Sequence, residues 1–155
     1  MKLTIIAVGN KMPTWINTGF DEYAKRMPPE ARIDLIELKP EERSGRHRGK
    51  VLDAEQARIE TALPKKALRV VLDLHGEMIS TKRLSACLGD WMREGNMPCF
   101  IIGSADGLAD GLKESARRSI ALSGCTLPHG VVRVILAEQL YRAWSLLNNH
   151  PYHRE

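Results

Sequence analysis

Cysteine is scarce in this sequence, and long apolar runs are absent. The 155 residues include only three cysteines. These are widely spaced and form no Cys-x-x-Cys pair, which favours a reduced compartment and argues against a structural zinc site. The first apolar run, residues 3–8, is far too short for a signal segment or a membrane span. We therefore expect a cytoplasmic protein with no metal and no membrane association.

Neither sign of charge dominates the composition. The chain has 23 Lys and Arg against 19 Asp and Glu, a formal net charge of +4, which favours an anionic partner without establishing one. Hydrophobic residues at 43% and charged residues at 27% are ordinary for a globular protein. A chain of this length can bury a substantial core, so residues 1–155 are expected to form a single domain.

Strand-like and helix-like segments alternate from end to end. Strands are expected at residues 3–8, 33–38, 68–74, 99–103 and 120–122, and helices after Pro13, at 51–63, after Ser80 and at 131–148. Strands that alternate with helices predict an α/β fold with a parallel sheet covered on both faces. Residues 39–50 form the one linker-like stretch.

Three loops that contain glycine follow predicted strands, at residues 72–76, 102–108 and 122–127. In open parallel sheets, ligands bind outside the carboxyl ends of the strands, where glycine lets a ligand approach the backbone closely. No loop matches the Gly-x-Gly-x-x-Gly or Gly-x-x-x-x-Gly-Lys-Ser/Thr pattern, which argues against a dinucleotide site or a P-loop. A turn role for each glycine and a shared small-molecule pocket both stay open.

Three polar residues mark the last predicted helix and the loop before it. His129 follows Pro128 and would act as a general base, bind phosphate or form a structural hydrogen bond. Glu138 and Arg142 are spaced i, i+4, as in an ordinary helical ion pair. The helix is apolar on several sides, however, which favours packing against a second subunit. In that setting the pair would be partly buried and functional.

Two segments favour contact with RNA. Residues 43–50 cluster cations in a predicted loop, which is either solvated or in contact with phosphate. The end of the chain combines Tyr152, His153 and Arg154, which have the groups to stack on a ring, move a proton and hold a phosphate. A metal bound by His150 and His153 is not expected.

The last third of the chain carries the motifs of a known family. They are the segments 127–129, 131–134, 138–142 and 149–155, with further matches at 1–3, 8–9, 11–12, 72–73 and 102–103. On these segments the sequence resembles the bacterial ribosomal RNA large subunit methyltransferase H family over essentially its full length. Members of that family methylate N3 of a pseudouridine in 23S rRNA.

The resemblance implies a three-layer α/β/α SPOUT methyltransferase fold with a parallel sheet, a C-terminal trefoil knot and a homodimeric assembly. It also implies S-adenosylmethionine as the methyl donor, held mostly by backbone groups of three loops. The residues carried over to the donor site are Leu72, Gly103, Leu122, Ser123, Gly124, Cys125, Thr126 and Leu127. The implied substrate is the 23S rRNA of the assembled 70S ribosome.

The implied reaction requires a ring nitrogen of the RNA base to lose its proton and to attack the donor's methyl group. The catalytic candidates are His129, Glu138, Arg142, Tyr152, His153 and Arg154. We expect the tail to close on the RNA when both ligands are present. The proton would pass to His153, His129 or Glu138.

The other three candidates would bind and orient the substrate. Tyr152 would stack on the base or hydrogen-bond to it, and Arg154 would hold a phosphate or the developing anion. Arg142 would orient the tail or the carboxylate of the donor.

Two positions depart from the family's pattern. Ser104 stands where members often have a second glycine, so that its side chain is expected to crowd the donor, and Gly130 replaces a proline or glutamine. Two alternatives to rRNA methylation therefore stay open. One is a non-catalytic ribosome-docking or ligand-binding protein of the same fold, and the other is a SPOUT methyltransferase that acts on tRNA.

Overall fold

The first apolar run forms the buried centre of the sheet. In the computed structural model, which describes residues 1–154, Leu3–Val8 is strand β1, and all six of its residues are buried. It pairs in parallel with β2 (Ile33–Leu38) on one side and with β4 (Pro98–Ile102) on the other. A strand covered on both faces needs a nearly continuous apolar run, and the sequence supplies it here.

Two further strands complete the sheet on the β4 side. These are β3 (Leu68–Met78) and β5 (Arg118–Ala121), and the strand order is β2-β1-β4-β3-β5. Every pairing in this sheet is parallel. The predicted parallel sheet is therefore confirmed, and the carboxyl ends of all five strands meet at the same edge.

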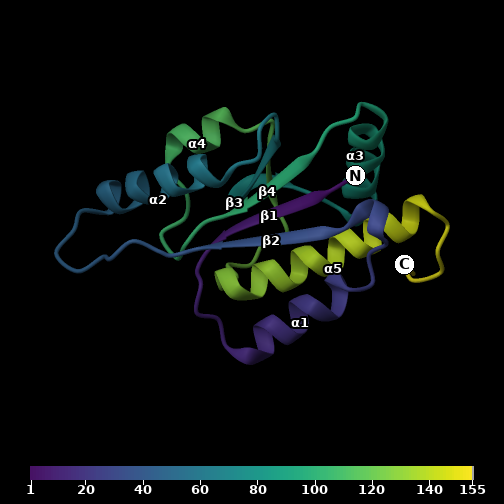
Figure 1. Ribbon diagram of the computed structural model, residues 1–155, viewed down its shortest axis with the longest axis horizontal. Helices are drawn as coiled ribbons and strands as arrows, with labels where there is room; N and C mark the ends of the chain where they lie inside the picture. Colours follow the sequence, from purple (N-terminus) through teal and green to yellow (C-terminus); the bar gives the residue numbers. More distant parts are fainter. Residues whose placement is uncertain (155) are drawn as a thin grey trace.

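Helices cover both faces of the sheet, as Figure 1 shows. One core cluster joins the sheet to α1 (Thr14–Ala24), α3 (Thr81–Arg93) and α5 (His129–Leu147). A second cluster joins the other face to α2 (Arg48–Ala62) and α4 (Asp110–Ser115). The three-layer α/β/α architecture is confirmed; the trefoil knot and the homodimer stay predictions.

Strand β3 is longer than predicted and irregular where it passes β5. Ile120 pairs first with Leu72 and then with Glu77, so that residues 73–76 bulge away from the ladder. Gly76 permits this close return, because a Cβ there would lie 2.8 Å from the backbone nitrogen of Ile120. The bulge puts polar residues at the edge of the sheet where the carboxyl ends meet.

The predicted boundaries differ from the structure at three places. The six-residue helix α4 was not predicted, and the end of the linker-like stretch 39–50 instead begins α2. The His47 side chain caps that helix by accepting a hydrogen bond from the backbone N–H of Gly49. His129 is the first residue of α5 rather than part of the preceding loop.

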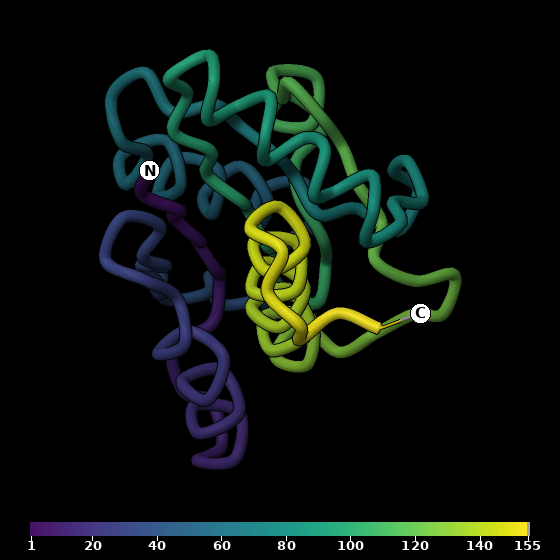
Figure 2. The backbone as a smooth tube through the Cα atoms, turned by 90° about the vertical axis from the view of Figure 1, so that its right-hand side faces the viewer, coloured from purple at the N-terminus to yellow at the C-terminus, as the bar shows by residue number. Residues whose placement is uncertain are grey.

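Residues 148–154 turn back beside the end of α5 (Figure 2). The backbone N–H of His150 donates to the carbonyl of Ser145 at 2.9 Å, which closes the helix. Glu155, the last residue of the predicted tail, lies outside the described residues. Within residues 1–154, no helix is both long and apolar enough to cross a membrane.

Candidate functional site

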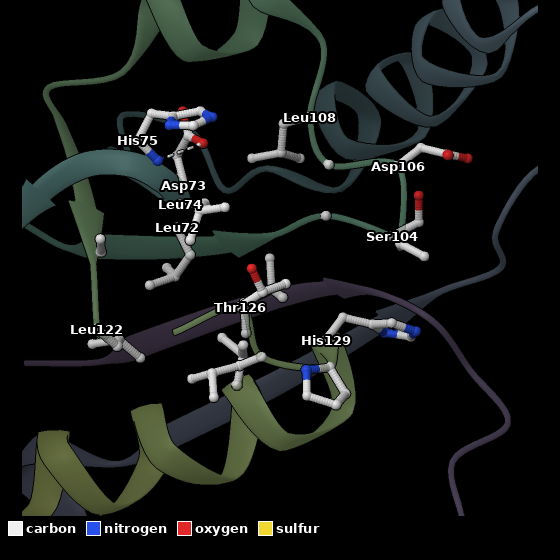
Figure 3. Close-up of a pocket in the computed structure, with 18 of the residues that line it drawn as sticks. Leu72, Asp73, Leu74, His75, Ser104, Asp106, Leu108, Leu122, Thr126 and His129 are labelled. Atoms are coloured by element: carbon white, nitrogen blue, oxygen red, sulfur yellow. Dashed lines mark hydrogen bonds between the residues drawn. The ribbon is translucent and has the colours of Figure 1, made fainter. Parts of the chain in front are cut away.

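A cavity of about 720 Å³ opens at the carboxyl ends of β3, β4 and β5 (Figure 3). Its walls come from residues 72–75, 102–108 and 120–129. These are the three loops singled out in the sequence and their flanks, so the three loops line one cavity. The volume lies within the range of about 300–1,000 Å³ that is typical of small-molecule sites.

Most residues predicted for the donor site lie in the walls of this cavity. The lining residues among them are Leu72, Gly103, Leu122, Ser123, Cys125, Thr126 and Leu127. Gly124 belongs to the same loop but is not among the lining residues, and a Cβ there would lie 3.6 Å from Met78 Cε. The predicted donor residues thus come together from three separate strands.

A tight turn shapes the wall after β4. The backbone N–H of Gly107 donates to the carbonyl of Ser104 at 2.9 Å, and Gly107 has a φ of +86°. A Cβ on Gly103 would lie only 2.3 Å from the Gly107 carbonyl oxygen. Glycine is therefore required at 103 to fold the turn against the sheet, whether or not a ligand is present.

The bulge in β3 gives the cavity an acidic side chain that sequence reasoning missed. Asp73 lines the cavity, accepts a hydrogen bond from the backbone N–H of His75 at 3.3 Å, and lies 3.5 Å from Lys113 Nζ. A carboxylate at the carboxyl end of a parallel strand can accept hydrogen bonds from ligand hydroxyls. The one signal in the sequence was an acidic residue near the carboxyl end of a predicted strand.

His129 lines the same cavity at the first turn of α5. Burial lowers its pKa, and the nearby cations Arg133 and Arg43 lower it further, while the charge of Glu55 acts in the opposite direction. Its Nδ1 atom is buried without a hydrogen-bond partner in the described part of the chain. Because its pKa is lowered, the ring is neutral at neutral pH and can accept a proton.

The lowered pKa of His129 predicts a specific pH dependence of stability. A histidine that is harder to protonate in the folded state contributes stability above its ordinary pKa of 6.5, and this contribution is lost as the pH falls. We expect the free energy of unfolding to fall more in the wild type than in His129→Asn between about pH 7.5 and about pH 5.5. Urea denaturation at the two pH values measures this difference, and equal losses would contradict it.

Arg133, one turn after His129, has its whole side chain buried. Its Nη1 atom donates to Glu37 Oε2 at 2.6 Å and its Nη2 atom donates to the Gly9 carbonyl at 3.0 Å. These bonds tie the start of α5 to the carboxyl ends of β1 and β2. Sequence reasoning gave Arg133 no role, although a cation within an otherwise apolar helix was a visible signal.

The cationic segment 43–50 lies at the rim of the cavity. Arg43 forms an ion pair with Asp106 at 2.8 Å, and Arg48 donates to the Asp106 backbone carbonyl at 2.7 Å. Both Arg48 and Asp106 line the cavity. Two cations of the segment are therefore held by the turn after β4, and contact of the segment with phosphate stays a prediction.

The remaining predicted catalytic residues gather at the other end of α5. Tyr152 donates its hydroxyl hydrogen to Glu138 Oε1 at 3.0 Å, and Arg142 donates to the same oxygen at 2.8 Å. The Arg142 guanidinium lies over the Tyr152 ring, 4.7 Å from its centroid. His153 Nδ1 lies 3.4 Å from Arg142 Nη1, whereas Arg154 is exposed.

The charges in this tail cluster set the protonation of its members. The hydrogen bond to Glu138 raises the pKa of Arg142, which stays a cation. Burial raises the pKa of Tyr152, and the hydrogen bond to Glu138 raises it further. Tyr152 is thus a hydrogen-bond donor at neutral pH and not a base.

The two groups of predicted residues do not meet within one chain. His129 lines the cavity, whereas Arg142 lies 13 positions later on the same helix, about 20 Å away at 1.5 Å per residue. The sequence places all six catalytic candidates in one site, and the single chain divides them between two.

Metal binding finds no support in the part of the chain that the structure describes. Within residues 1–154, no three His, Cys, Asp or Glu side chains are grouped so that they could hold a metal ion.

Comparison with known proteins gives consistent matches over the whole chain. The family model described as "Predicted SPOUT methyltransferase" matches residues 1–153. The chain is 58% identical to the ribosomal RNA large subunit methyltransferase H of Ralstonia pickettii (strain 12J) over 155 residues, which cover 99% of both chains. It is 59% identical to the protein of that name from Burkholderia mallei (strain SAVP1), with the same coverage.

Solved structures show the same fold at low sequence identity. A probable methyltransferase from Bordetella pertussis Tohama I matches with a TM-score of 0.55 and 14% identity, covering 91% of this chain and 95% of that one. A probable methylase family protein from Haemophilus influenzae Rd KW20 matches with a TM-score of 0.55 and 11% identity, covering 99% and 70%. At such identities the likeness concerns the fold alone.

Proposed function

Because the chain belongs to the SPOUT methyltransferase family, we propose that it transfers the methyl group of S-adenosylmethionine to N3 of a pseudouridine in 23S rRNA. The observation that carries this proposal is the 58–59% identity, over 99% of the chain, to proteins named for methylation of large-subunit rRNA. The cavity at the carboxyl ends of the strands provides the site for the donor.

The residues around the cavity suit this donor. Leu72, Leu122 and Leu127 offer apolar surface for an adenine ring, and Asp73 offers an acceptor for ribose hydroxyls. Three loops expose backbone groups at the edge, which fits the lack of a side-chain nucleotide motif. When bound, S-adenosylmethionine supplies an electrophilic methyl group on a sulfonium.

His129 is the best-placed acceptor for the proton of the ring nitrogen. Of the three candidates it is the one that lines the cavity, and its lowered pKa keeps it neutral. Glu138 instead accepts hydrogen bonds from both Arg142 and Tyr152. These bonds occupy the Glu138 carboxylate and fit a residue that positions the tail.

The separation of the two groups of residues supports a homodimer. Arg142, which holds the tail, lies about 20 Å along α5 from His129, so the tail can act at the cavity of a second copy. Tyr152, His153 and Arg154 of one subunit would then close over the base bound at the other. In this arrangement Glu138 and Arg142 set the position of the tail.

We further propose the assembled 70S ribosome as the substrate, and hence a cytoplasmic location. A net charge of +4 gives weak electrostatic attraction to free RNA. Several of the cations near the cavity are already paired with carboxylates. Recognition must therefore depend on the shape of a preformed RNA surface.

Transfer of labelled methyl groups tests the proposal. Three substrates are tested in parallel: intact 70S ribosomes, free 50S subunits and bulk tRNA. All are prepared from cells that lack this protein. We expect label in 70S ribosomes and little in 50S subunits or tRNA. Ribosomes with uridine instead of pseudouridine at the labelled position then test the preferred base.

The other outcomes would favour the alternatives. Label in tRNA alone would keep the methyl donor and discard the ribosomal substrate. Binding of S-adenosylmethionine with no transfer to any RNA would identify a non-catalytic protein of the same fold. A single-chain mass in solution would contradict the homodimer.

A further inference from the structure

A carboxyl group is buried directly behind one wall of the cavity. Glu55 of α2 is 3% exposed, and both of its carboxyl oxygens accept hydrogen bonds. Ser104 Oγ donates to Oε1 at 2.7 Å, and the backbone N–H of Glu41 donates to Oε2 at 3.0 Å. Burying a carboxyl group is costly unless hydrogen bonds compensate for the lost water. The buried Glu55 carboxyl group therefore favours structures in which both donors stay in place.

The two donors belong to different loops at the edge of the sheet. Ser104 follows β4 and lines the cavity, whereas Glu41 belongs to the segment 39–47, between β2 and α2. The Glu55 side chain thus joins the wall of the cavity to the loop 39–47. The Ser104 hydroxyl forms this bond, so Ser104 supports the wall of the cavity. That its side chain also crowds the donor stays a prediction from the sequence.

Further polar contacts strengthen the same connection. Arg58, one turn after Glu55, lies 2.8 Å from Glu41 Oε2 and donates to the Lys39 carbonyl at 2.7 Å. On the other side, Arg43 pairs with Asp106 at 2.8 Å. The segment 39–47 is therefore fixed both to α2 and to the turn that forms the wall.

We propose that Glu55 is a positioning residue for the methyl donor, which acts through Ser104 to hold the wall at residues 103–107 in its binding shape. The same carboxyl group holds the loop 39–47 against that wall. The inference rests on the proposed function, because it assigns the cavity to S-adenosylmethionine.

An electrostatic effect of Glu55 on His129 distinguishes this role from simple support of α2. The charge of Glu55 raises the pKa of His129 against the opposing effects of burial, Arg133 and Arg43. Figure 3 shows Ser104 and His129 on the same side of the cavity. Removing the charge while keeping the shape should therefore change the titration of His129, which a purely structural residue would not do.

Three variants separate the bonds from the charge. In Glu55→Ala, the Glu41 N–H and the Ser104 hydroxyl lose their acceptor, and the wall samples shapes that do not bind the donor. We expect the affinity for S-adenosylmethionine, measured by calorimetry, to fall at least about tenfold, and by about three- to tenfold in Ser104→Ala. Glu55→Gln can still accept from Glu41 and can donate to Ser104, so its affinity should stay within about threefold.

Glu55→Gln should nevertheless lower the pKa of His129, which NMR titration of the imidazole ring measures. The matched control is Glu60→Ala, on the same helix. Glu60 pairs with Arg69 at 2.8 Å and takes no part in the cavity wall. Its donor affinity should equal that of the wild type.

Hydrogen exchange of the free protein gives a readout that needs no ligand. Amides of residues 39–43 and 103–107 should exchange faster in Glu55→Ala and in Ser104→Ala, but not in Glu60→Ala. If Glu55→Ala does not fold, Ser104→Ala carries the same test. Unchanged exchange and unchanged donor affinity in a folded variant would overturn the inference.

The experiment also separates this inference from the proposed function. A wild-type chain that binds no S-adenosylmethionine refutes the proposed function and the donor part of the inference together. Hydrogen exchange then still decides whether Glu55 holds the two loops. Normal wild-type binding with no loss in Glu55→Ala overturns the inference alone.

Discussion

Deleting residues 151–155 is expected to abolish methyl transfer while leaving the binding of S-adenosylmethionine unchanged. The deletion removes Tyr152, His153 and Arg154, which the proposed mechanism uses to hold the RNA base. Loss of such positioning typically costs at least about 100-fold in rate. The donor cavity is formed by other segments and stays intact. Single-turnover transfer to 70S ribosomes and calorimetric titration with the donor measure the two effects separately.

The variant Tyr152→Phe, which removes only the hydroxyl group, controls for loss of the structure of α5 in the truncated chain. Tyr152→Phe keeps the ring between Tyr141 and the Arg142 guanidinium but removes the hydrogen bond to Glu138. Its stability should stay close to that of the wild type, since one partly exposed hydrogen bond contributes about 1 kcal/mol. Turnover in the truncated chain at the wild-type rate would exclude a catalytic tail.

Weak cation–π contacts help to hold the tail against α5. Two guanidinium groups, of Arg26 and Arg142, lie over the Tyr152 ring, with centroid distances of 5.9 Å and 4.7 Å. Cation–π contacts at partly exposed sites are worth about 0.5–1 kcal/mol each. The tail is therefore held in a defined place but can be rearranged by a bound RNA or a second subunit.

The sequence predicted those parts of the fold that depend on local pattern. The run Leu3–Val8 and the helix capped by Ser80 appear as expected, because apolar periodicity and a capping side chain act within a few residues. Helix α4 was missed, because six residues are too few to show a helical period. The bulge at residues 73–76 depends on the close approach of β5 to Gly76, which no local pattern encodes.

The loops that line the cavity could be predicted from the sequence, whereas the meeting of the catalytic candidates in one site stays a prediction. Most of the predicted donor residues do surround one cavity, because loops after parallel strands must meet at one edge. The bond between Glu55 and Ser104 was not visible, since the two residues are 49 positions apart. Helix α5 separates His129 from the tail cluster within one chain, so their meeting in one site requires the second subunit that the sequence also predicts.

Replacing Gly103 by alanine should weaken the binding of S-adenosylmethionine while leaving the tail cluster intact. The new Cβ would lie 2.3 Å from the Gly107 carbonyl oxygen and 3.0 Å from Leu108 Cδ2, so the turn must move. Overpacking of this kind costs about 1–3 kcal/mol, equivalent to a roughly five- to 150-fold loss of affinity for S-adenosylmethionine. Gly111→Ala is the matched control, because its Cβ would make only an ordinary contact at 3.6 Å with Gln56.

Mixing this variant with the truncated chain tests whether one site uses two subunits. In a mixed dimer, the truncated subunit contributes an intact cavity and the Gly103→Ala subunit contributes an intact tail. Random pairing of equal amounts makes half of the dimers mixed, each with one complete site, so about a quarter of the wild-type activity should return. If cavity and tail act within the same chain, no mixed dimer has a complete site, and the mixture will be as inactive as its components.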